Sequence, residues 1–112
     1  MTRTQSATEP LYSTLAGDPH LGDIVDLFVQ EMPGRMANLQ DRLNSGDWGG
    51  LRRLAHQLKG AAGSYGFDAI TPSAAEVEDA IREARPEEEI RRAVDSLVAL
   101  CDQARAGMPL SD

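Results

Sequence analysis

The sequence predicts an all-α protein, an antiparallel up-down four-helix bundle with a short N-terminal extension. The first observation is that apolar residues recur at spacings of three and four along four separate stretches, which is typical of helices that bury one face. The second is that aromatic residues make up only 4% of the 112 residues, so the core is filled mainly by aliphatic side chains. No stretch alternates as a strand does, and short connections between amphipathic helices favour antiparallel packing.

The first helix is predicted to begin at Asp18-Pro19, an acidic N-cap followed by proline at the first helical position. Pro33 lies inside the helix and is expected to kink it rather than end it. The stretch NSGD closes the helix, and Asp47 is placed to cap the next one. The apolar face consists of Leu21, Ile24, Phe28, Met32, Met36, Leu39 and Leu43.

The second helix is predicted from Trp48 to Ser64, and Gly66 suits a left-handed residue that ends it. Its apolar face consists of Leu51, Leu54, Ala55, Leu58, Ala61, Ala62 and Tyr65. The start of the third helix stays open, because Thr71-Pro72 can serve as its cap and first residue after a turn over residues 67–70. The apolar positions of the third helix are Ile70, Ala74, Val77, Ile81 and Ala84.

Arg85-Pro86 breaks the chain, and the three acids at positions 87–89 favour the start of a fourth helix, which is expected to end at Gly107. Its apolar face consists of Ile90, Ala93, Val94, Leu97, Leu100, Cys101 and Ala104. After the four faces pack together no large apolar surface is left over, so we expect a monomer.

Composition excludes several classes of protein. The net charge of −7 disfavours nucleic acid and anionic membranes as partners. No run of about 18 apolar residues could span a membrane, and the first ten residues lack the apolar segment of a secretory signal, so we expect a cytoplasmic protein. The single cysteine, Cys101, allows no internal disulfide and is expected to fill the core. We expect flexible tails at residues 1–10 and 108–112 around one domain, residues 11–107; these short polar ends favour a stand-alone protein.

Positive charge gathers on the second helix. Between Trp48 and Phe67 the sequence has no Asp or Glu, but it has Arg52, Arg53 and Lys59. This segregation indicates a surface that attracts a small anion or an acidic patch, although chance produces such stretches as well.

His56 lies on the outward face of the second helix, two positions from both Leu54 and Leu58. Its neighbours at spacings of three, four and seven are Arg52, Arg53, Lys59, Gly60 and Gly63. Imidazole is a good nucleophile at neutral pH, a lysine one turn away balances arriving negative charge, and glycines let a bulky partner approach. The alternative is a plain surface histidine with glycines that serve close helix packing.

The stretch AHQLKG followed by AAGSYG resembles the signature of histidine-containing phosphotransfer (HPt) domains, Ala-His-x-Leu-Lys-Gly with a further glycine six residues later. The resemblance extends over residues 11–106. It implies a carrier that relays a phosphoryl group between aspartates of receiver domains, with a response regulator or a hybrid histidine kinase as partner. The resemblance implies that Mg²⁺ is supplied by the receiver, and no metal or cofactor is expected in this chain.

The resemblance also implies individual roles. His56 would accept the phosphoryl group on its outer ring nitrogen, Lys59 would contact the phosphoryl oxygens, and Gly60 would leave room for the receiver. Gly66 would form the turn into the third helix. Thr71-Pro72-Ser73 departs from the family, which usually continues an unbroken helix there. Residues expected beside the site or in docking are Gln57, Gly63, Ser64, Arg52 and Arg53.

Two alternatives remain from other classes. A non-catalytic four-helix module would bind receivers or kinases without being phosphorylated. A metal-carboxylate bundle needs glutamate three positions before an inward-facing histidine, but those positions before His56 and His20 hold Arg53 and Gly17. The chain has no Gly-rich phosphate loop for ATP, so a carrier rather than a kinase is expected. We also expect poor phosphatase activity, because no water-activating base is evident beside His56.

Overall fold

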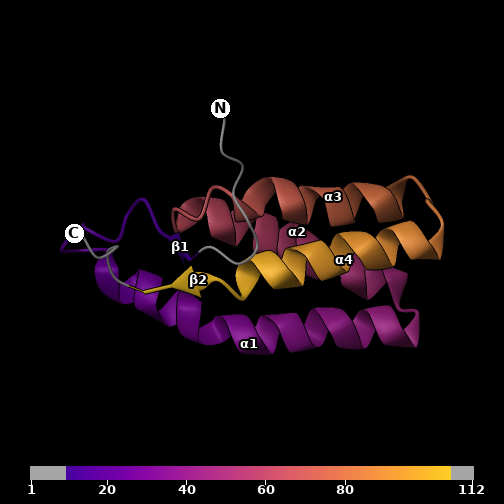
Figure 1. Ribbon diagram of the computed structural model, residues 1–112, viewed down its shortest axis with the longest axis horizontal. Coiled ribbons are helices and arrows are strands. Elements are labelled where there is room, and N and C mark those ends of the chain that lie inside the picture. The colour runs from indigo at the N-terminus through magenta and orange to yellow at the C-terminus, as the bar shows by residue number, and fades with distance from the viewer. Residues whose placement is uncertain (1–9, 107–112) are drawn as a thin grey trace.

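The computed structural model describes residues 10–106 and contains four helices. They are α1 (Gly22–Ser45), α2 (Trp48–Ser64), α3 (Ile70–Arg82) and α4 (Glu87–Cys101), with two short strands, β1 (Leu11–Tyr12) and β2 (Ala104–Arg105). Successive helices run in opposite directions side by side (Figure 1), so the predicted four-helix bundle is confirmed. Within the described residues no helix is long and apolar enough to cross a membrane. Of the tails expected at residues 1–10 and 108–112, all but residue 10 lie outside this part of the chain.

The four apolar faces meet in one core. Phe28 stacks on Phe67 with ring centroids 5.6 Å apart, and its ring centroid lies 4.9 Å from that of Tyr65. These aromatic contacts join α1 to the end of α2. The predicted core position Cys101 is buried. The largest fully buried side chains are Phe28, Leu39, Leu51, Leu58, Ile70, Leu97, Val25, Val77, Val94 and Cys101.

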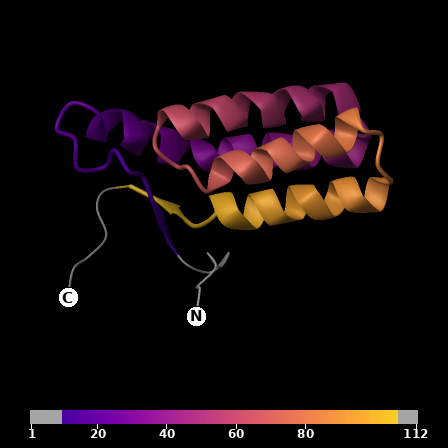
Figure 2. The ribbon, with the colours of Figure 1, turned by 90° about the horizontal axis from the view of Figure 1, so that it is seen from above.

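The predicted start of α1 is wrong. The Asp18 side chain does not cap a helix; it accepts a hydrogen bond from the His20 backbone at 2.7 Å in a turn, and α1 begins at Gly22. The first turns of α1 reach past the ends of the neighbouring helices (Figure 2). Ile24, predicted in the core, is 42% exposed, whereas Val25 is 1% exposed and takes the core position on the face that continues through Phe28.

The connection between α1 and α2 agrees with the prediction that NSGD closes the first helix and Asp47 caps the second. α1 continues through Pro33 and ends at Gly46, which has a left-handed φ of 72°. The Asp47 side chain then accepts a hydrogen bond from the Gly50 backbone at 3.0 Å and caps α2, as expected.

The open question about α3 is resolved: the helix begins at Ile70 and includes Thr71-Pro72. Pro72 is the third residue of this helix, where a backbone N–H would have no partner within the helix. A proline at this position therefore does not disturb the helix.

The expected extension of α4 to Gly107 and the expected absence of strands are wrong. α4 ends at Cys101, and β2 pairs in parallel with β1, so that Leu11 lies opposite Ala104 and Tyr12 opposite Arg105. This pairing ties the N-terminal segment to the end of the last helix.

The N-terminal segment also crosses the turn between α2 and α3. The Ser13 hydroxyl donates to the Tyr65 carbonyl, and the Thr14 backbone donates to the Gly66 carbonyl at 2.9 Å. Gly66 has a φ of 80°, as its predicted role in the turn requires. A Cβ at this position would lie 2.5 Å from Ser13 Oγ and 2.7 Å from Thr14 Oγ1, so glycine is needed for space as well as for conformation.

We predict that Gly66→Ala destabilises the protein more than Gly46→Ala does. Both glycines have positive φ, which costs an alanine roughly 1–2 kcal/mol. A Cβ at Gly46 would meet nothing within 4 Å, whereas one at Gly66 must displace the N-terminal segment, adding an overpacking cost of about 1–3 kcal/mol. Urea unfolding of the two variants measures the difference. Equal losses would show that the crossing segment does not constrain this turn.

Candidate functional site

The candidate site lies on the outward face of α2, beside α3. The buried face of this helix is formed by Leu51, Ala55, Leu58 and Ala62, which leaves His56 on the surface with a side chain 65% exposed. The prediction that His56 points away from the core is confirmed.

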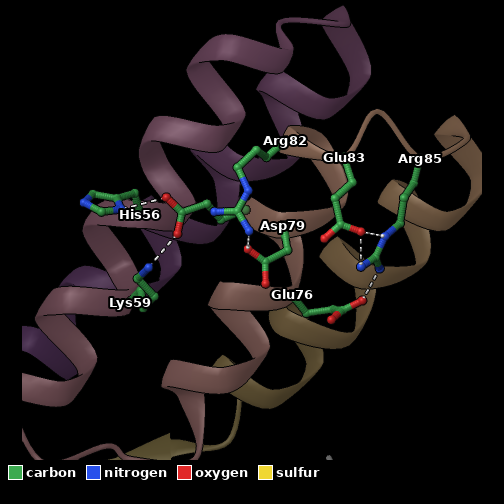
Figure 3. A network of polar contacts seen from close by, with 8 residues as sticks. His56, Lys59, Glu76, Asp79, Arg82, Glu83 and Arg85 are labelled. Atoms are coloured by element: carbon green, nitrogen blue, oxygen red, sulfur yellow. Dashed lines mark hydrogen bonds and ion pairs between the residues drawn. The ribbon is translucent and has the colours of Figure 1, made fainter.

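An acid from α3 completes the site. Glu78 is only 8% exposed, yet its two carboxylate oxygens each have a partner on α2. Its Oε2 lies 2.7 Å from His56 Nδ1, and its Oε1 accepts a hydrogen bond from Lys59 Nζ at 2.6 Å. Figure 3 shows His56 and Lys59 converging on this one carboxylate.

The hydrogen bond from Lys59 lowers the pKa of Glu78, and the contact with His56 acts in the same direction. Burial opposes this shift without reversing it. The carboxylate is therefore ionised at neutral pH and can only accept hydrogen bonds. It follows that Nδ1 of His56 carries a proton, which it donates to Glu78. In the neutral ring Nε2 then carries the lone pair; this tautomer is assigned from the hydrogen-bond network.

Glu78 was missed in the sequence, although a signal was present. It lies four residues after Ala74 and three before Ile81, on the apolar face of the third helix. A charged residue at such a position needs a partner, because burying an unpaired charge is costly. Glu78 thus places a carboxylate beside His56, where no base was evident from the sequence.

Two of the predicted docking residues lie close to the phosphoacceptor candidate. A groove of about 340 Å³ is lined by Gly49, Arg52, Arg53, His56 and Glu78. The other two predicted docking residues, Gly63 and Ser64, are exposed but do not line this groove. Gln57 is exposed as well and lines a separate, smaller pocket toward α1.

The glycines beside His56 have no packing role that requires their small size. A Cβ at Gly60 would meet nothing within 4 Å, and one at Gly63 would make an ordinary contact of 3.6 Å with Thr71 Oγ1. Both residues are exposed. Within residues 10–106 the alternative that these glycines serve close helix packing is therefore wrong.

Other reactive residues lie apart from the site. Within residues 10–106 no three His, Cys, Asp or Glu side chains come together as a metal site would require. His20 is exposed in the turn before α1. Cys101 is buried, and burial raises the pKa of its thiol to about 12, which makes it unreactive.

The fold and this site define a four-helix module with an exposed, carboxylate-supported histidine. The family model of the Hpt domain matches residues 23–107, and the chain belongs to this family. Hpt domains are phosphocarriers rather than kinases, so this chain is a phosphotransfer module of two-component signalling. The comparisons with curated proteins and with solved structures found no match.

We predict that the contribution of Glu78 to stability disappears in acid. Its pKa is lowered below the ordinary 4.5 in the folded protein, so the ionised carboxylate stabilises the fold above pH 4.5. This stabilisation is lost as the pH falls below 4.5 through the pKa of the folded state. Urea unfolding of the wild type and Glu78→Gln should therefore show a difference in stability that narrows from pH 6 to pH 3. A stability difference that stays constant over this range would contradict the pairing of ionised Glu78 with Lys59 and His56.

Proposed function

We propose that this chain relays a phosphoryl group between receiver-domain aspartates through phosphohistidine at His56. The observation that supports this best is the state of the imidazole: it is exposed, and its Nδ1 is held by a buried, ionised carboxylate. The nucleophilic Nε2 is thereby left for a partner. A surface histidine without a function would not need such a support.

The chemistry of transfer fits this arrangement. The Nε2 lone pair attacks the phosphorus of an aspartyl phosphate, the P–O bond breaks, and its electron pair returns to the aspartate carboxylate. The proton on Nδ1 stays in place, and the ring becomes an imidazolium that still donates this proton to Glu78. No proton has to leave, so His56 needs no base. The same steps in reverse return the phosphoryl group to an aspartate.

Lys59 has two roles in this proposal. Its ammonium group donates one hydrogen bond to Glu78 and keeps that carboxylate ionised. An ammonium group has three donors, and the side chain is one third exposed, so it can also turn toward the phosphoryl oxygens. Mg²⁺ and the remaining catalytic groups are expected from the receiver.

Glu78 does not make the domain a phosphatase in this proposal. Both of its oxygens are engaged, one by His56 and one by Lys59, and the residue is 8% exposed. A carboxylate in this state is poorly placed to activate a water molecule against the phosphorus. The phosphohistidine should therefore persist until a partner takes its phosphoryl group.

The partners we propose are receiver domains of response regulators or of a hybrid histidine kinase, which a monomeric carrier would meet in the cytoplasm. Gly60 would let a receiver approach His56 closely, because it presents no side chain and lies in open space. Gln57, Gly63 and Ser64 are exposed around it and would form part of the contact.

The direct test is phosphotransfer from phosphorylated receiver domains to the wild type and to His56→Gln. Label should appear on the wild type, be acid-labile and alkali-stable, and be absent from the variant. Unfolding curves establish that both proteins are folded. A folded wild type that binds a receiver but never accepts label would favour the non-catalytic binding module instead.

We further predict that Gly60→Ala stabilises the protein but slows transfer. Replacing an exposed helical glycine with alanine contributes up to about 1 kcal/mol to the stability of a helix, and no atom within 4 Å opposes it. Gly34→Ala on α1 is the matched control: a Cβ there also meets nothing, and α1 does not line the groove at His56. Both variants should gain stability, and only Gly60→Ala should transfer more slowly. Equal transfer rates would remove the proposed role of Gly60.

A further inference from the structure

The arginines beside His56 differ from the others in the described part of the chain. Arg52 and Arg53 lie four and three residues before His56, so all three side chains share one face of α2. Within residues 10–106 neither arginine has an ion pair or a side-chain hydrogen bond. Every other arginine in this range has a polar partner: Arg35, Arg42, Arg82, Arg85, Arg91, Arg92 and Arg105.

Lys59 does not supply uncompensated charge at the site. Its ammonium lies 2.6 Å from Glu78 Oε1, so this cation and this anion balance each other. Before transfer, with a neutral imidazole, the positive charge that remains around His56 is that of Arg52 and Arg53, two charges in all. A phosphoryl group carries about two negative charges, so the two arginines match it.

The geometry of the groove also places the two arginines where a phosphoryl group on His56 could reach them. Because Nδ1 of His56 faces Glu78, Nε2 lies on the other side of the ring; Figure 3 shows the imidazole extending away from the helices. Besides His56, the groove is lined by both arginines, by Gly49 and by Glu78, whose charge Lys59 balances. A Cβ at Gly49 would meet nothing within 4 Å, so the groove is open at that position. Guanidinium groups bind phosphoryl oxygens through paired, charge-assisted hydrogen bonds.

We propose that Arg52 and Arg53 bind the phosphoryl oxygens of phosphohistidine, while Lys59 chiefly holds Glu78. This inference rests on the proposed function of His56. It assigns to the two arginines a part in the transfer itself, where the sequence suggested docking alone.

The test uses phosphoramidate, a small phosphoryl donor that has no protein surface to dock. His56 Nε2 attacks its phosphorus, the P–N bond breaks, and ammonia leaves. Rates of phosphohistidine formation are compared for the wild type, Arg52→Gln, Arg53→Gln and the double variant. Arg92→Gln is the matched control, since it removes the same charge from an exposed arginine on α4. His56→Gln establishes the site of labelling.

The double variant should be phosphorylated roughly 10- to 100-fold more slowly, the range expected when hydrogen bonds to a charged group are lost. Arg92→Gln should stay within about twofold of the wild type, because screening weakens a remote surface charge. In ³¹P NMR titrations the phosphoryl group of the double variant should protonate at a higher pH, because two cations no longer favour its dianion. Unfolding curves check that every variant is folded.

Each contrary result has a distinct meaning. Wild-type rates and an unchanged ³¹P titration in the double variant, with only receiver transfer slowed, would overturn this inference and leave the arginines as docking residues. A Lys59→Ala variant slowed roughly 10- to 100-fold, with the double variant at the wild-type rate, would overturn it in favour of lysine. A folded wild type labelled by neither phosphoramidate nor any receiver would overturn the proposed function and this inference together.

Discussion

The candidate site depends on the contacts of the ionised Glu78 carboxylate with His56 and Lys59. This carboxylate is supplied by α3, but it accepts hydrogen bonds from two residues of α2, His56 and Lys59. These contacts keep the acid charged despite its burial, and the charged acid in turn holds the proton on Nδ1 of the imidazole. A rigid pair of helices thereby sets the tautomer of an exposed ring.

The surroundings of His56 divide into parts with different physical tasks. Lys59 forms an ion pair with the same carboxylate that contacts the imidazole, and its ammonium group balances the negative charge of Glu78. Arg52 and Arg53 line the groove and have no ion pair within residues 10–106. Gly60 and Gly63 present no side chain to the outside, although an alanine would fit this chain at either position. In our proposal, this charge binds the phosphoryl group and this space admits the receiver domain.

A second constraint holds the ends of the described chain against the bundle. The segment that follows β1 crosses the turn between α2 and α3, and Gly66 leaves the space for it. The pairing of β1 with β2 joins the same segment to the end of α4. Three connections that are distant in the sequence are therefore coupled at one end of the molecule, opposite the turns that join α1 to α2 and α3 to α4 (Figure 1).

The sequence by itself determined the four helices, the cap at Asp47 and the exposure of His56, because helical periodicity and capping are local properties. Local rules failed at Asp18-Pro19, where a good helix start is instead a turn ahead of α1. They also failed for β1 and β2, which pair across nearly the whole described chain. Glu78 could have been noticed as an acid on an apolar face, but only the packing of α3 against α2 decided that His56 and Lys59 are its partners. Such contacts join residues far apart in the sequence, and the tertiary structure alone brings them together.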